Sequence, residues 1–122
     1  MIAGRIRAYE ARIRVKLRGP TGHEEAVEGL LDTGFTGALT LPPSVIAALD
    51  LNWRSTDSGT LADGSHCQLD LYEAVVLWGR REREIIVAEA DATPLIGMWL
   101  LYGHEMNMRI YEGGSVTIKK LK

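Results

Sequence analysis

Apolar and polar side chains alternate over the first eighteen residues, as they do in a strand with one solvated face. Ile6 and Ala8 occupy even positions, and from Tyr9 onward the apolar residues occupy odd positions. A shift of one residue in this pattern predicts a β-bulge inside one long strand. The cluster Gly19-Pro20-Thr21-Gly22 then predicts a turn that ends this segment.

Short apolar runs bounded by glycine, proline and aspartate continue to the end of the chain. They predict further strands at 25–31, 38–41, 60–62, 65–71, 72–78, 84–88, 108–111 and 115–119, hairpins at 63–64 and 79–81, and turns at 57–59 and 103–107. Pro42-Pro43 opens an apolar pattern that predicts a short helix ending at Leu49. The apolar run 94–101 is expected to be buried. About seven or eight short strands with one or two helices predict a mainly β fold, either a closed barrel or a folded-over sheet.

The composition limits what kind of protein this can be. At 122 residues the chain is long enough for one hydrophobic core and too short for two, so we interpret 1–122 as a single domain. One cysteine, Cys67, excludes an internal disulfide. No apolar run approaches the ~20 residues that span a bilayer, and the N-terminus has no apolar signal segment. We therefore expect a cytoplasmic protein with no membrane partner.

Charge gives little support to nucleic-acid binding. The net charge is −2, although six basic residues and only one acid lie between Arg5 and Arg18. On an alternating strand these basic side chains form one solvated face, and we favour this interpretation over a small nucleic-acid-binding β-barrel. The three histidines are far apart in the sequence and lack metal-ligand spacing, so we expect neither a metal nor a cofactor.

Asp32 is the best candidate for chemistry. It follows two leucines at the end of a predicted strand and is followed by Thr33 and Gly34. A carboxylate in this position can accept hydrogen bonds from the amides of the loop, which offset the cost of its partial burial. The missing side chain at Gly34 leaves room for a ligand to approach. An isolated Asp-Thr-Gly is common in ordinary turns, so the interpretation depends on its surroundings.

Those surroundings carry a family resemblance. Residues 30–42, Leu-Leu-Asp-Thr-Gly-Phe-Thr-Gly-Ala-Leu-Thr-Leu-Pro, resemble the active-site segment of the retropepsin-like (clan AA) aspartic proteases, in particular small bacterial members. Two further segments follow in the family's order. Ala62-Asp63-Gly64-Ser65 resembles the flap, and Leu95-Ile96-Gly97 resembles the apolar-apolar-Gly element before the C-terminal helix. Retroviral members commonly carry Arg-Asn after that element, whereas Met98-Trp99 follow it here.

The resemblance implies a retropepsin-like barrel and an aspartic endopeptidase that acts on a peptide or protein substrate. Such an enzyme needs two aspartates, and this chain has one Asp-Thr-Gly, so the resemblance implies a homodimer in which each subunit contributes Asp32. Thr33 would then hydrogen-bond across the dimer axis, Gly34 would let the substrate lie close, and Ala62 to Ser65 would close over the peptide. The alternative is a peptide- or protein-binding module that keeps this fold without hydrolysis.

Overall fold

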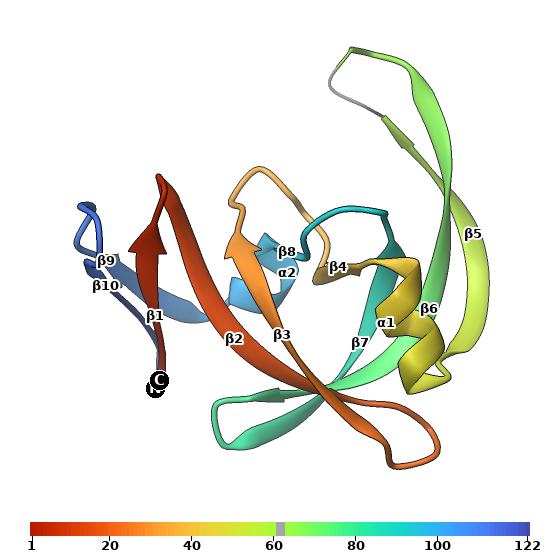
Figure 1. Ribbon diagram of the computed structural model, residues 1–122, viewed down its shortest axis with the longest axis horizontal. Coiled ribbons are helices and arrows are strands. Elements are labelled where there is room, and N and C mark those ends of the chain that lie inside the picture. The colour runs from red at the N-terminus through yellow and green to blue at the C-terminus, as the bar shows by residue number, and fades with distance from the viewer. Residues whose placement is uncertain (61–62) are drawn as a thin grey trace.

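The computed structural model describes residues 1–60 and 63–122, which form one ten-stranded sheet and two short helices (Figure 1). The strands are β1 (Ile2–Arg7), β2 (Glu10–Arg18), β3 (Glu24–Leu31), β4 (Leu39–Leu41), β5 (Asn52–Thr60), β6 (His66–Trp78), β7 (Arg81–Glu89), β8 (Leu95–Ile96), β9 (His104–Met108) and β10 (Ser115–Lys120). The helices are α1 (Pro43–Leu49) and α2 (Met98–Leu101). The mainly β fold predicted from the sequence is confirmed, with more strands than expected.

The sheet closes on itself. Its strand order is β5-β6-β7-β4-β8-β3-β2-β1-β10-β9, and β6 also pairs with β2 through Leu17 and Val76. Strands β6, β7, β4, β8, β3 and β2 therefore form a ring, which is the predicted barrel. Leu17, Leu39 and Val76 are fully buried in its core. Alternate residues of each ring strand face inward, because successive side chains in a strand point to opposite faces.

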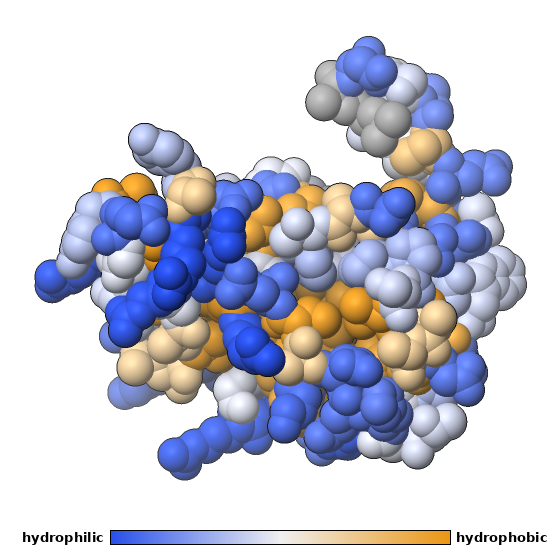
Figure 2. Space-filling model, in the orientation of Figure 1, coloured by the Kyte–Doolittle hydropathy of each residue, from blue (hydrophilic) through white to orange (hydrophobic). Residues whose placement is uncertain are grey.

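Two regions extend beyond the ring (Figure 1). On one side β5 pairs with β6 to form a long hairpin that stands clear of the body. On the other side β1 pairs with β10, and Ile2 lies opposite Ile118. Figure 2 shows the projecting hairpin and an apolar band across the middle of the body, bordered by charged residues. The hairpin and the body thus present two sides of a hollow.

The predicted β-bulge near the N-terminus is wrong, because the chain turns there instead. Strands β1 and β2 form a hairpin in which Arg7 lies opposite Glu10. The two turn residues, Ala8 and Tyr9, have φ angles of 51° and 66°. A two-residue turn with positive φ at both positions matches the twist of the flanking strands. The turn, not a bulge, moves the apolar positions from even to odd numbers.

Four other predictions differ from the structure. Residues 57–59 form no turn, because they belong to β5, which pairs with β6 in regular register from Ser55 to Thr60. The two strands expected at 65–71 and 72–78 are one strand, β6. Residues 103–107 are not a turn: β9 occupies most of them, and the segment 108–111, expected to be extended, mostly follows β9. Met106 and Met108 pack against the core while Glu105 and Asn107 are exposed, which is the alternation of a strand.

The remaining elements agree with the sequence. The turn at 19–22 joins β2 to β3, and the Gly22 amide donates to the Gly19 carbonyl. Helix α1 and strands β3, β4 and β10 also form where they were predicted, and the hairpin predicted at 79–81 turns at 79–80, with Arg81 already in β7. The hairpin expected around Asp63-Gly64 joins β5 to β6, with Thr60 opposite His66. Leu61 and Ala62, the rest of its predicted first strand, lie outside the described residues.

Candidate functional site

Asp32 lies directly after β3, where main-chain hydrogen bonds fix it on both sides. Its amide donates to the Ile96 carbonyl at 2.9 Å, and its own carbonyl accepts from the Phe35 amide at 3.2 Å. The Gly34 amide donates to the Asp32 carboxylate oxygen Oδ1 at 2.9 Å. Asp32 is half-buried, whereas Thr33 and Gly34 are exposed. The loop therefore holds the carboxylate by backbone atoms and leaves one of its sides accessible.

The apolar-apolar-Gly element lies beside this loop. Its strand, β8, runs parallel to β3 and places Leu95 opposite Leu30 and Ile96 opposite Leu31. The Leu95 amide donates to the hydroxyl of Thr40, a buried residue of β4, at 2.9 Å. Strand β8 thus joins β3 to β4 and sets the position of Asp32 relative to both. The two segments that the sequence identified separately form one unit.

Gly97 permits a close backbone contact behind the loop. Its amide donates to the Ala38 carbonyl at 3.0 Å, and the next amide, of Met98, donates to the Phe35 carbonyl at 2.8 Å. A Cβ atom at Gly97 would overlap the Gly37 carbonyl oxygen and lie 2.7 Å from the Phe35 carbonyl oxygen. The glycine is therefore required for space, which explains its place directly after Ile96.

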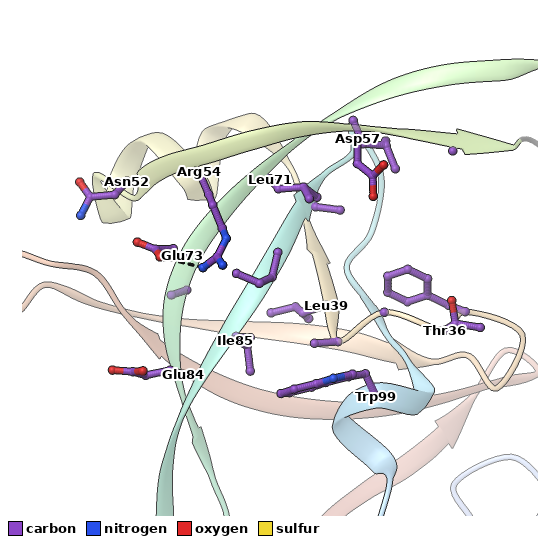
Figure 3. Close-up of a pocket in the computed structure, with 18 of the residues that line it drawn as sticks. Thr36, Leu39, Asn52, Arg54, Asp57, Leu71, Glu73, Glu84, Ile85 and Trp99 are labelled. Carbon is purple, nitrogen blue, oxygen red and sulfur yellow. Dashed lines mark hydrogen bonds and ion pairs between the residues drawn. The ribbon is translucent and has the colours of Figure 1, made fainter.

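A cleft of about 960 Å³ begins at this loop and extends beneath the β5–β6 hairpin (Figure 3). Gly34 and Phe35 of the loop line it, whereas Asp32 and Thr33 do not. Its apolar wall includes Leu39, Leu71, Ile85 and Trp99, and charged residues including Arg54, Asp57, Glu73 and Glu84 also line it. The cleft has the size and the mixed lining that ligand-binding sites share.

Trp99 is one of the cleft residues that the sequence did not identify. The run 94–101 was expected to be buried, but Met98 and Trp99 are 43% and 51% exposed. In the short helix α2 these two residues face outward while Leu100 and Leu101 face the core. A run in which every residue is apolar has no alternation of apolar and polar positions. The sequence therefore does not show which of its residues face solvent and which face the core.

The predicted flap corresponds to the β5–β6 hairpin. At its tip Asp63, Gly64 and Ser65 are all exposed, and Gly64 has a φ of 86°. The Ser65 amide and hydroxyl donate to Asp63 Oδ1 at 2.9 Å and 2.6 Å. Ala62, also predicted to belong to the flap, lies outside the described residues. The described part of the tip is thus a turn that the Asp63 carboxylate organises.

This turn has an expected pH dependence. The two hydrogen bonds from Ser65 lower the pKa of Asp63 below its ordinary value of 3.8. Because the bonds favour the ionised carboxylate, the turn is stabilised above that ordinary value and loses this stabilisation as the pH falls through the lowered pKa. In an NMR titration, the Ser65 amide shift should change with a midpoint below 3.8, and Asp63→Asn should remove the transition. A midpoint at or above 3.8 would contradict this interpretation.

Most basic side chains of β2 form ion pairs with glutamates of neighbouring strands. Arg12 contacts Glu28 of β3 at 3.3 Å, and Arg18 contacts Glu24 of β3 at 3.3 Å and Glu82 of β7 at 2.7 Å. The hydrogen bond from Arg18 lowers the pKa of Glu82. These cross-strand pairs favour the solvated strand face over a nucleic-acid-binding surface.

Residues 1–60 and 63–122, which the structure describes, contain no group of three or more His, Cys, Asp or Glu side chains placed to hold a metal ion. None of their helices is long and apolar enough to cross a membrane.

Comparison with known proteins identifies the fold. No protein-family model and no curated protein matches the chain. Among solved structures, it is similar to the EIAV protease in complex with the inhibitor HBY-793, with a TM-score of 0.57 and 17% identity over 75% of this chain and 85% of that one. It is also similar to a retropepsin-like aspartic protease from Rickettsia conorii, with a TM-score of 0.53 and 15% identity over 96% of this chain and 93% of that one.

These matches confirm that the chain has the retropepsin-like fold. At these identities the likeness concerns the arrangement of the backbone. The roles of Asp32, Thr33 and Gly34, of the hairpin tip, and of Leu95, Ile96 and Gly97 stay predictions, and they rest on the geometry above.

Proposed function

We propose that this protein is an aspartic endopeptidase that works as a homodimer, with Asp32 of each subunit in one shared active site. The observation that carries the proposal is the placement of Asp32 within a retropepsin-like fold. The main chain of β8 fixes the residue, which does not itself line the large cleft but contributes its loop to it: Gly34, whose amide donates to the Asp32 carboxylate, is a lining residue. A carboxylate held in this way, partly accessible and next to a cleft, is suited to activate water.

The proposed chemistry requires two carboxylates in different protonation states. The ionised one accepts a proton from a water molecule, whose oxygen attacks the carbonyl carbon of the peptide bond. The protonated one donates a hydrogen bond to the carbonyl oxygen, which carries negative charge in the tetrahedral intermediate. A proton is then transferred to the leaving nitrogen as the C–N bond breaks. Two carboxylates in contact do not readily ionise together, so the pair shares one proton and titrates as a unit.

One chain supplies one of these carboxylates. The other Asp-Gly pair, Asp63-Gly64, lies at the exposed tip of the β5–β6 hairpin and does not follow a buried strand end. A second Asp32 can come only from a second copy, which a two-fold axis would place opposite the first. Exposure of Thr33 and Gly34 supports this arrangement, because both are free to meet the partner's loop.

The peptide would lie in the cleft in extended form. Residues of β5, among them Arg54 and Asp57, line the cleft on the hairpin side, so closure of the hairpin would exclude water from the reacting atoms. Main-chain groups of the hairpin would hydrogen-bond the peptide, as in other proteins that bind extended segments.

The second candidate is a peptide-binding module without hydrolysis. It is favoured by the same cleft, which a single chain already forms, whereas the second carboxylate is absent from that chain. Dimerisation separates the two candidates, because only the enzyme needs two copies to act.

The test is the dependence of activity on protein concentration. A mixed peptide library is incubated with the protein at several pH values, and sedimentation velocity is measured on the same samples. We expect activity per subunit to rise with concentration in parallel with the dimer fraction, because the monomer holds half a site. A protein that stays strictly monomeric at high micromolar concentration between about pH 4 and 7 would overturn the proposal.

A further inference from the structure

Trp99 occupies an unusual place for a large aromatic residue. Its side chain is 51% exposed, although its neighbours Leu100 and Leu101 are buried. In Figure 3 its ring lies across the cleft wall opposite β5, with Ile85 and Leu39 on the side toward the hairpin. Leaving this much apolar surface in water is unfavourable, and a ligand that covered it would recover the lost free energy.

Arg83 of β7 holds the ring in place. Its guanidinium carbon lies 5.1 Å from the ring centroid of Trp99, a cation–π distance, and its Nη1 donates to the Leu100 carbonyl at 3.1 Å. Trp99 lines both the cleft and a smaller hollow beside it, whereas Arg83 lines the smaller hollow and not the cleft. The indole is thus a wall between the two spaces, with Arg83 on one side and the cleft on the other.

The charged residues around the cleft limit which side chains of a bound peptide it would accept. Arg54 pairs with Glu73 at 3.0 Å, and Arg18 pairs with Glu82 at 2.7 Å, so both cations are already matched. Within the described residues, Asp57 and Glu84 form no ion pair. Both are exposed and line the cleft. They give the cleft a negative excess that would repel an acidic side chain.

We propose that Trp99 forms a specificity subsite that takes a large apolar side chain of the peptide and rejects an acidic one. The inference rests on the proposed function, since it concerns the same peptide. It is also supported by the lining of the cleft, in which the segment from Gly34 to Leu39 and Trp99 take part together. A peptide bound in this cleft close to the Asp32 loop would therefore place a side chain against the indole. Arg83 is the positioning residue, because it orients the ring without facing the cleft.

The experiment compares cleavage of a positional-scanning peptide library by the wild type, Trp99→Ala and Trp99→Phe. Trp53→Ala is the matched control, because Trp53 is a similarly exposed tryptophan whose indole hydrogen-bonds Asp70 and does not line the cleft. We expect one substrate position at which the wild type prefers leucine or phenylalanine over alanine about tenfold or more, with aspartate disfavoured further. Trp99→Ala should lose the apolar preference at that position only, while Trp99→Phe and the control keep it.

A binding measurement separates this inference from the proposed function. Asp32→Asn is titrated with the same peptides, and affinity is followed by fluorescence polarisation. Apolar-selective binding that disappears with the added Trp99→Ala substitution supports the subsite even if the wild type cleaves nothing, and then only the proposed function fails. Cleavage whose preference is unchanged by Trp99→Ala overturns the subsite and leaves the function standing. Absence of peptide binding to every variant overturns the subsite as well.

Discussion

Replacing Asp32 by asparagine is expected to lower kcat/KM for peptide cleavage by about 10³-fold or more. The amide has nearly the shape of the carboxylate, and its oxygen can still accept the hydrogen bond from the Gly34 amide. It cannot accept a proton from water, because an amide is not a base in this pH range. Loss of activity with an unchanged unfolding midpoint in urea would therefore locate the effect in the chemical step. Asp91→Asn, in an exposed loop away from the cleft, is the control. Cleavage that survived Asp32→Asn would refute the mechanism.

The same variant tests whether two subunits share one site. When equal amounts of wild type and Asp32→Asn are mixed and allowed to exchange subunits, about a quarter of the dimers contain two wild-type chains. Activity should fall to about that fraction of the pure wild type, because a mixed dimer has a single carboxylate. A fall to about half would mean that each subunit works alone and would contradict the shared site.

The second large effect is expected at Gly97. Replacing it by alanine forces a Cβ atom onto the Gly37 carbonyl oxygen, and main-chain atoms cannot rotate away as the end of a long side chain can. We expect a loss of about 2 kcal/mol or more in the free energy of unfolding, measured by urea denaturation. Activity should also fall, because the contact positions β8 and hence Asp32.

Gly22→Ala provides the matched control for this substitution. Gly22 has a φ of 90° and open space around an added Cβ, so alanine there adds backbone strain without overlap. We expect Gly22→Ala to lower the free energy of unfolding by about 1–2 kcal/mol. If Gly97→Ala were no more destabilising than Gly22→Ala, the close contact behind the active-site loop would not have the importance that we give it.

Local sequence signals were sufficient for most of the barrel. Glycine clusters and Asp-Gly located several of the hairpins, and the two prolines located the start of α1. The hairpin at Ala8 and Tyr9 was missed because neither residue type favours positive φ, so no local signal announces a turn that the pairing of β1 with β2 imposes. Strand β9 was missed because Gly103 and the polar residues after it are typical of a turn, whereas its pairing with β10 decides its conformation.

In the candidate site, too, local sequence signals predicted one residue and missed another. The position of Asp32 at a strand end could be read from two leucines and the Thr-Gly that follows. The exposure of Trp99 could not, because it depends on which side of α2 the barrel covers and on an arginine sixteen positions earlier in the chain. The proposed second carboxylate would come from a second copy of the chain, so neither the sequence nor the fold of one chain can place it.

The way in which Asp32 is held has a consequence for how this sequence can change. The Leu30 amide donates to the Pro94 carbonyl, the Asp32 amide donates to the Ile96 carbonyl, and the loop closes through the Phe35 amide. All of these hydrogen bonds join main-chain atoms. Every amino acid has these atoms, except that proline lacks the amide hydrogen. The side chains on β3 and β8 can therefore be exchanged for others of similar volume without moving the carboxylate. Proteins with this architecture can diverge until few of their residues coincide, and the positions that resist substitution are those where the backbone itself needs room.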